Sequence, residues 1–182
     1  MGFTNLIIDP NPKKDHYSLN SSLAERLALH LGGETKVIRI YDFPQGYFNY
    51  EYNQEWIDSL KEANRLIFPV PMWNFSIPAA LKDFFDKISQ KGKLWDFDDK
   101  KNYIGHLKGK SAFIIMTSGE DYPADSPKDF VVPYLRLILR FLGIEQVKDF
   151  RLGGVRDKDL AADKAYMTQV TRAMLKTFGL KV

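Results

Sequence analysis

Short apolar runs alternate with amphipathic helical patterns along the whole chain, and this alternation restricts the fold more than any other feature. An apolar run without polar alternation predicts a strand covered on both faces, and an amphipathic pattern between two such runs predicts a crossover helix. Five such units predict one α/β domain, a doubly wound five-stranded parallel sheet in the order 2-1-3-4-5 with helices on both faces. The expected strands are 3–9, 36–41, 65–70, 111–116 and 146–152, and the expected helices are 18–31, 54–63, 78–88, 127–142 and 157–178.

Two prolines bear on these elements. Pro78 suits the first turn of the helix 78–88, whose apolar residues have the spacing of a single stripe. Pro69 fits the strand 65–70 less well, because proline donates no hydrogen bond to a strand ladder. We therefore expect this strand to end near Pro69.

Composition narrows the function classes. The 182 residues include no cysteine, which excludes disulfides, thiolate metal sites and a cysteine nucleophile, so redox chemistry would require a cofactor. The length fits one domain over residues 1–182, and the dispersed net charge of +3 does not indicate nucleic acid. Without a targeting segment or a long apolar stretch, we expect a cytoplasmic protein with no membrane partner.

Three loops are the candidate binding site. In doubly wound sheets, ligands bind outside the carboxyl ends of the strands where the strand order reverses. In the order 2-1-3-4-5, this places the loops after the first, third and fourth strands side by side. They are residues 10–22, 71–78 and 117–127.

The first loop ends in small polar residues at a helix start, namely Ser18, Asn20, Ser21 and Ser22. Hydroxyls beside the free N–H groups of a helix N-terminus can bind a phosphate. The same residues are also the preferred N-caps of any helix, and the loop has no glycine-rich nucleotide fingerprint. Both interpretations stay open.

The second and third loops combine aromatic and polar residues. In the second, Met72, Trp73, Asn74 and Phe75 offer apolar faces and an amide to a flat heteroaromatic ring, although they would also serve to cap the helix that follows. In the third, Ser118 offers a hydroxyl, and Gly119 allows close backbone approach, as in an ordinary turn.

No pattern predicts a metal site. The three histidines are scattered, and the acidic residues Asp96, Asp98 and Asp99 fit a solvated turn better than a cation site. The helix 127–142 is apolar on more than one stripe, with Arg136 and Arg140 on a narrow polar side. We expect it to lie in a two-fold interface.

Three segments resemble the FMN-dependent NAD(P)H azoreductase and quinone oxidoreductase family. They read PMWNFSIPAALKDFFDKI (71–88), GKSAFIIMTSG (109–119) and DFVVPYLRLILRFLGI (129–144). The resemblance in element order covers essentially the whole chain. It implies a flavodoxin-like fold, bound FMN and a homodimer with active sites at its interface. It also implies a ping-pong reaction in which NADH or NADPH reduces FMN before a quinone, an azo compound or a similar flat acceptor takes two electrons.

The resemblance also implies the roles of particular residues, with no catalytic side chain because the chemistry belongs to the flavin. The phosphate would be held by Asn11, Ser18, Leu19 and Asn20. The ring and ribityl chain would be lined by Met72, Trp73, Asn74 and Phe75, with backbone N–H groups, Asn74 among them, near the reactive N5. The pyrimidine edge would be bordered by Thr117, Ser118, Gly119 and Glu120, and the acceptor would meet Phe97 and Tyr122.

The chain departs from the family pattern in two loops. A single Gly119 precedes Glu120 and Asp121, where the family usually has two adjacent glycines, and this acidic pair should disfavour anionic acceptors. Pro10 and Pro12 stand where serine is common. Two alternatives remain open: an accessory module that regulates a partner protein, and a one-electron flavodoxin carrier.

Overall fold

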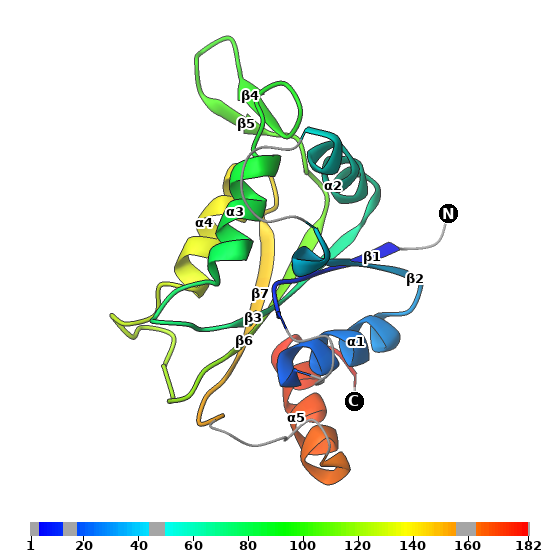
Figure 1. Ribbon diagram of the computed structural model, residues 1–182, viewed down its shortest axis with the longest axis vertical. Coiled ribbons are helices and arrows are strands. Elements are labelled where there is room, and N and C mark those ends of the chain that lie inside the picture. Colours follow the sequence, from blue (N-terminus) through cyan, green and yellow to red (C-terminus); the bar gives the residue numbers. More distant parts are fainter. Residues whose placement is uncertain (1–3, 13–17, 44–49, 156–162, 182) are drawn as a thin grey trace.

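The computed structural model describes residues 4–12, 18–43, 50–155 and 163–181. A five-stranded parallel sheet in the order β2-β1-β3-β6-β7 forms its centre (Figure 1). This order confirms the prediction, because the two additional strands pair only with each other as a separate antiparallel hairpin. The sheet strands are β1 (Thr4–Asp9), β2 (Glu34–Arg39), β3 (Arg65–Pro71), β6 (Ser111–Thr117) and β7 (Gln146–Leu152), and the hairpin strands are β4 (Trp95–Phe97) and β5 (Tyr103–Gly105).

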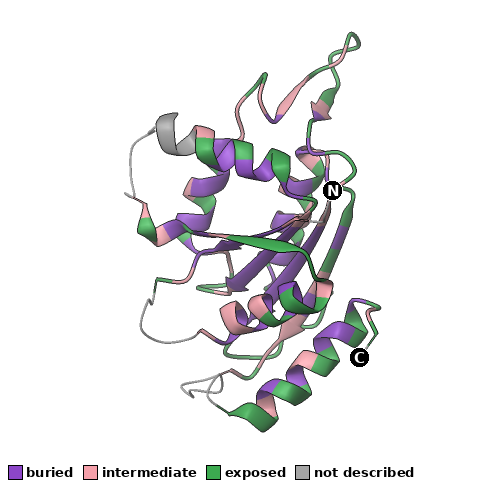
Figure 2. Ribbon diagram, turned by 90° about the vertical axis from the view of Figure 1, so that its right-hand side faces the viewer, coloured by how far each residue is buried: buried purple, intermediate pink, exposed green. Residues whose placement is uncertain are grey.

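In the described part of the chain, five α-helices cover both faces of the sheet. They are α1 (Leu19–Leu31), α2 (Tyr50–Glu62), α3 (Ala79–Ile88), α4 (Val132–Phe141) and α5 (Lys164–Thr177). Helices α1 and α5 lie together on one face, and α2, α3 and α4 lie on the other (Figure 1). Strand β1 shows the alternation that this requires, since Leu6 and Ile8 face α2 to α4 while Ile7 faces α1 and α5. The central strands β1, β3 and β6 are therefore buried on both sides, whereas the edge strand β2 is largely exposed (Figure 2).

Strand β3 extends further than predicted. It continues to Pro71, and Pro69 pairs with Ile115 of β6. Its register with β1 ends at Ile67, so the missing N–H of Pro69 leaves no ladder bond unmade on that side. The Pro69 carbonyl instead accepts a hydrogen bond from Asn11 Nδ2 at 3.4 Å. A proline is thus accommodated in a central strand because the neighbouring strand has already diverged.

Several predicted boundaries are wrong. Strand β2 lies two residues earlier, because Ile40–Asp42 forms a 3₁₀ turn. Helix α4 begins at Val132 and not at residue 127, since the segment before it forms turns closed by the Ser126 and Asp129 N–H groups. The predicted last helix begins at Lys164 among the described residues, and residues 157–162 lie outside them.

The hairpin β4–β5 was not predicted, and it packs on the carboxyl end of α4. Leu107 N–H donates to the Leu142 carbonyl at 2.9 Å. A Cβ on Gly105 would collide with the backbone of Leu142 and Gly143, so a glycine is needed for this approach. Four aromatic rings seal the contact, namely Trp95, Phe97, Tyr103 and Phe141. Across the described ranges, no helix is long and apolar enough to cross a membrane.

Candidate functional site

The carboxyl edge of the sheet brings the three predicted loops together. The second and third loops are joined by a hydrogen bond from Met72 N–H to the Thr117 carbonyl, at 2.8 Å. The first loop is tied to the same edge by Asn11, whose amide donates to Ser21 Oγ of α1 at 3.0 Å and to Pro69 of β3. Adjacent parallel strands end at one edge, so this meeting follows from the strand order.

A pocket of about 300 Å³ lies between the second and third loops. It is lined by Met72, Asn74, Phe75, Ser118, Gly119, Glu120 and Tyr122. All of these residues were predicted from the sequence to contact a ring or its acceptor. Thr117 and Trp73 flank the pocket without lining it: Thr117 is buried at the end of β6, and the Trp73 side chain is 42% exposed.

The second loop contains a strained turn. Asn74 and Phe75 have φ angles of 48° and 70°, and reciprocal backbone hydrogen bonds of 3.0 Å join Trp73 to Ser76 around them. Asparagine tolerates this left-handed region, whereas a bulky aromatic residue rarely occupies it. The Phe75 ring meets Tyr122 edge to face, with centroids 6.4 Å apart. The turn thereby presents an amide and an aromatic ring at the pocket.

Contacts to β7 hold the third loop. The buried Ser118 donates its N–H to the Leu152 carbonyl and its hydroxyl to the Glu120 carbonyl, at 3.0 and 2.7 Å. Gly153 directly follows β7 and packs against Glu120 and Asp121. A Cβ there would come within 2.6 Å of Asp121 Cα and 2.7 Å of the Glu120 carbonyl oxygen. The path of this loop therefore requires a glycine at position 153.

The described end of the first loop forms the N-terminus of α1. Ser18 is the N-cap, and its hydroxyl accepts from Ser21 N–H at 3.2 Å and donates to Asn20 Oδ1 at 2.5 Å. Asn20 is 2% exposed, and among the described residues its Nδ2 has no hydrogen-bond partner. A buried amide donor without an acceptor is costly. At the positive end of a helix with no acidic residue in its first turn, this donor fits an anionic ligand.

Asn11 and Leu19 have internal contacts. The Asn11 amide donates to the buried Asp9 carboxylate at 2.5 Å as well as to Ser21 and Pro69. It therefore connects the first loop to β1, α1 and β3. The Leu19 side chain is buried in the core beside α1 and α5. Phosphate contacts from these two residues remain predictions.

Phe97 is not brought to the pocket within one chain. It lies on the hairpin, where its ring centroid is 4.9 Å from that of Tyr103, in a tilted arrangement, and 5.1 Å from Lys91 Nζ. The nearby acidic turn is closed by Asp98, whose carboxylate accepts the N–H groups of Lys100 and Asn102. Within the ranges that the structure describes, no group of three or more histidine or acidic residues could hold a metal ion.

A smaller hollow of about 240 Å³ adjoins the second loop, lined by Ser76, Ile77, Lys82 and Tyr134. Burial raises the pKa of the Tyr134 phenol, which keeps it protonated and able to donate. The hydrogen bond from Lys82 to Asp86 raises the pKa of the lysine. Its charge is therefore engaged by a carboxylate four residues away.

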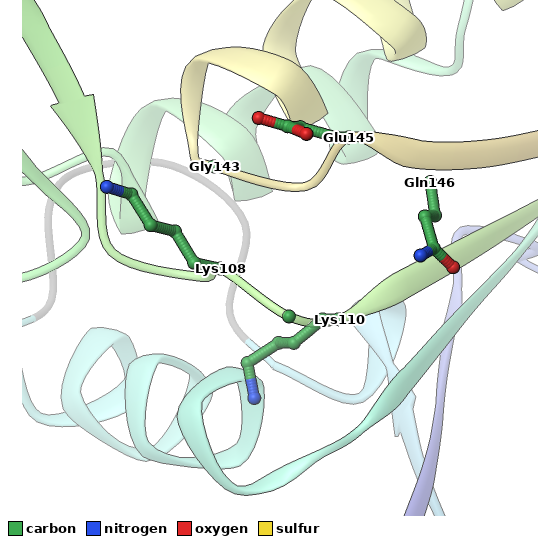
Figure 3. Close-up of a pocket in the computed structure, with 6 residues that line it drawn as sticks. Lys108, Lys110, Gly143, Glu145 and Gln146 are labelled. Atoms are coloured by element: carbon green, nitrogen blue, oxygen red, sulfur yellow. The ribbon is translucent and has the colours of Figure 1, made fainter.

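Another hollow, of about 210 Å³, lies at the opposite edge of the sheet (Figure 3). Lys108, Glu145 and Gln146 line it near the amino ends of β6 and β7. Lys110 also lines it, and its side chain runs toward α2, where its ammonium donates to the carbonyls of Lys61 and Ala63. Burial lowers the pKa of Lys110. Its ammonium therefore closes the end of α2.

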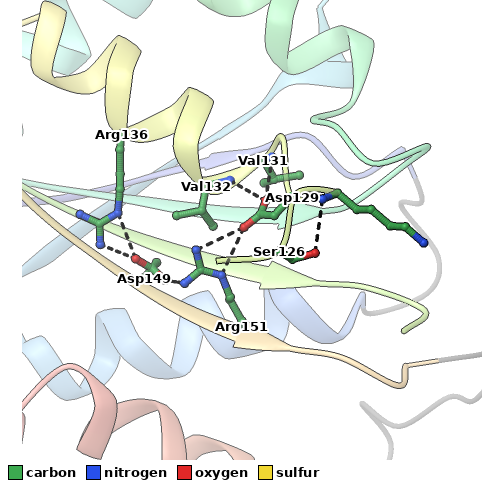
Figure 4. Close-up of polar contacts among 8 residues, drawn as sticks. Ser126, Asp129, Val131, Val132, Arg136, Asp149 and Arg151 are labelled. Atoms are coloured by element: carbon green, nitrogen blue, oxygen red, sulfur yellow. Dashed lines mark hydrogen bonds and ion pairs between the residues drawn. The ribbon is translucent and has the colours of Figure 1, made fainter. Parts of the chain in front are cut away.

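Sequence reasoning missed the residues that support the pocket from β7. Gly153 shapes the third loop, and Arg151 belongs to a buried ionic network that also contains Asp129 (Figure 4). The adjacent glycines 153 and 154 directly after a predicted strand were a usable signal. The network gave none, because its members are far apart in the sequence.

Comparison with known proteins agrees with this architecture. A model of the flavodoxin-like fold family matches residues 4–176, and the chain belongs to this family. An FMN-dependent NADH:quinone oxidoreductase of Yersinia enterocolitica is 39% identical over 127 residues, covering 66% of this chain and 62% of that protein. A protein of the same name from Beijerinckia indica is 36% identical over 108 residues, covering 58% and 53%.

A solved structure has the same fold. The FMN-dependent NADH-azoreductase of Bacillus anthracis, in complex with FMN, superposes with a TM-score of 0.76 at 22% identity, covering 95% of this chain and 98% of that one. The sequence matches, by contrast, span about half the length of the first curated relatives.

Proposed function

We propose that this protein is an FMN-dependent NAD(P)H oxidoreductase that reduces quinones, azo compounds or similar flat acceptors by two electrons. The observation that carries the proposal is the pairing of an aromatic and amide pocket with an unpartnered buried amide at a helix N-terminus, along one sheet edge. Relatives named FMN-dependent NADH:quinone oxidoreductases support it.

The residues present fit FMN at both ends. At the N-terminus of α1, the Asn20 amide and the Ser18 hydroxyl would face the phosphate. In the pocket, Asn74 and Phe75 would contact the ring from one side and Ser118 and Gly119 from the other. We include residues 1–182 in a single FMN-binding domain.

Bound FMN would supply the two-electron chemistry, and the chain would supply position and electrostatics. The half-exposed Phe75 ring and Tyr122 would offer apolar surface to a flat acceptor. Glu120 lines the pocket and Asp121 follows it, so their carboxylates should repel anionic acceptors. We therefore expect neutral quinones to be better acceptors than sulfonated ones.

We further propose that the protein acts as a homodimer through α4 and the hairpin. An apolar groove of about 410 Å³ is lined by Tyr103, Tyr134, Leu137, Ile138 and Phe141. The side chains of Leu137 and Tyr103 are 70% and 64% exposed, more than an isolated chain usually leaves. Phe97 would reach an acceptor site only in a second copy, and a monomer by light scattering at micromolar concentration would contradict this.

We also propose that the enzyme works in the cytoplasm, where nicotinamide donors are available, without a nucleic-acid or membrane partner. The absence of cysteine and the dispersed charge support this placement. Fractionation of cells that express the full chain would test it, and recovery with the membrane or with nucleic acid would contradict it.

The purified protein tests the central proposal directly. We expect a yellow protein whose flavin is bleached by NADH or NADPH and restored by a quinone. Failure of the apoprotein to take up FMN would overturn it. Reduction without rapid reoxidation by quinones would favour the carrier alternative.

Asn20→Asp tests the phosphate end. Aspartate keeps the oxygen that accepts from Ser18 and Ser21, but it replaces the unpartnered donor with a negative charge. We expect it to weaken FMN binding by about tenfold or more, the cost of one lost charge-assisted bond. Riboflavin, which lacks the phosphate, should bind both forms equally; an equal loss for both ligands would remove Asn20 from the phosphate site.

A further inference from the structure

The strained turn at Phe75 is held by a hydrogen bond from outside the second loop. Phe130 N–H donates to the Phe75 carbonyl at 3.1 Å. A left-handed conformation at a bulky residue persists only where its surroundings enforce it. The position of Phe130 therefore bears on the shape of the pocket.

Phe130 is placed by the residue before it. Asp129 Oδ1 accepts the N–H groups of Val131 and Val132 at 2.9 and 3.1 Å, which caps the start of α4 (Figure 4). The Asp129 side chain is fully buried. Its carboxylate thus fixes the backbone that directly follows Phe130, while the Phe130 N–H contacts the turn.

Arg151 holds the other oxygen of that carboxylate. Its Nε and Nη2 lie 3.3 and 3.2 Å from Asp129 Oδ2, and its Nη1 pairs with Asp149. Asp149 in turn pairs with Arg136 of α4, so the network links β7 to α4 on both sides (Figure 4). Both Arg151 and Asp149 are largely buried, which makes these pairs sensitive to the loss of one partner.

The same stretch of β7 also supports the third loop. The Leu152 carbonyl, next to Arg151, accepts the Ser118 N–H. Gly153 lies in close contact with the backbone of Glu120 and Asp121. The two walls of the pocket are therefore set from one strand end: one through the backbone of Leu152, the other through the Arg151 side chain, Asp129 and Phe130.

We infer that Arg151 is a positioning residue, which acts through Asp129 to hold the Asn74–Phe75 turn in the shape that binds the FMN ring. This inference rests on the proposed function. Arg151 does not line the pocket, so its effect on the cofactor would be indirect.

Arg151→Gln and Asp129→Asn test this role. Each should lower FMN affinity by about tenfold, a coupling typical of residues in contact, and should shift the visible spectrum of bound FMN. The double variant should lose less than the sum of the two, because the two introduced amides can hydrogen-bond to each other. Lys110→Gln is the matched control: it removes a partly buried cation that closes α2, and should lower the thermal stability of the apoprotein without changing FMN affinity or spectrum.

Hydrogen exchange in the apoprotein provides a readout that needs no cofactor. Arg151→Gln should speed exchange at the Ser76 and Phe130 amides, and Lys110→Gln should not. If Arg151→Gln lowers stability as the control does but leaves these amides, FMN affinity and the flavin spectrum unchanged, the inference is wrong. If the wild-type protein takes up no FMN, the proposed function fails, and the exchange rates still decide whether Arg151 holds the turn.

Discussion

Two groups of partly exposed aromatic side chains lie at opposite edges of the sheet and are held in different ways. At the carboxyl edge, Phe75 is placed by a left-handed turn and a backbone hydrogen bond, and its ring meets Tyr122 edge to face. On the hairpin, the Trp95, Phe97 and Tyr103 rings contact one another, and the Trp95 indole also donates to the Ser89 carbonyl at 2.9 Å. The shape of the first group depends on one strained backbone turn, whereas ring packing adds to regular strand pairing in the second.

This difference indicates where each region is sensitive. A ring held by other rings can be replaced by another ring with a small loss. A pocket wall held by backbone bonds changes shape whenever its support moves, even when no residue of the wall is altered. Substitutions that displace the backbone should therefore separate the two regions most clearly.

The largest effect is expected from adding a Cβ at the closely packed glycine of each region, Gly153 at the pocket and Gly105 at the hairpin. Gly153→Ala places a Cβ against the backbone of Glu120 and Asp121. Overpacking of this kind costs about 1–3 kcal/mol, or about 5- to 150-fold if it is expressed in cofactor binding. We expect FMN affinity to fall within this range, measured by quenching of flavin fluorescence.

Gly105→Ala is the counterpart at the hairpin. Its Cβ would meet the backbone of Leu142 and Gly143, with a similar cost of about 1–3 kcal/mol in unfolding free energy. FMN affinity should fall less than in Gly153→Ala, because no residue that lines the pocket of the same chain is displaced. Equal losses of FMN affinity in the two variants would show that the regions are not independent.

A smaller effect should come from the backbone of Phe75 itself. Phe75→Val and Phe75→Asn both remove the ring, but valine tolerates a φ of 70° poorly and asparagine tolerates it well. Valine should therefore cost about 1–2 kcal/mol more than asparagine in unfolding free energy. Equal stability by chemical denaturation would mean that the turn relaxes and stores no strain.

The smallest effect concerns the hairpin turn. Hydrogen bonds from Asn102, and from the Lys100 backbone, lower the pKa of the Asp98 carboxyl below its ordinary value. Its contribution to the turn is therefore complete above the ordinary aspartate pKa and is lost as the pH falls through the lower, folded value. NMR shifts of the Asn102 amide should follow this titration in wild type and not in Asp98→Asn, and a midpoint at or above the ordinary value would contradict it.

Local pattern sufficed for the five strands of the sheet, for the existence of the helices and for the position of the second and third loops. Periodicity identified β1, β3, β6 and β7 within a few residues, and the strand order then brought the predicted loops to one edge. These features depend on residues close together in the sequence or on a general rule of the fold.

Long-range contacts could not be read in the same way. The hairpin was missed because its strands have three residues each and packing on Gly143 stabilises them. The Arg151–Asp129 pair was missed because 22 residues separate its members. The end of β3 was predicted from the poor strand propensity of Pro69. The strand continues past Pro69 because its pairing with β1 has already ended at Ile67.

The support of the pocket by β7 has a consequence for how the chain is made. Every pairing in the sheet joins strands separated by at least one helix, so each pair must close a long loop before it forms. Both pocket loops are synthesised before the last strand. A nascent chain that has not yet reached Arg151 contains the pocket residues without their support, so the binding site should be among the last parts of the molecule to mature.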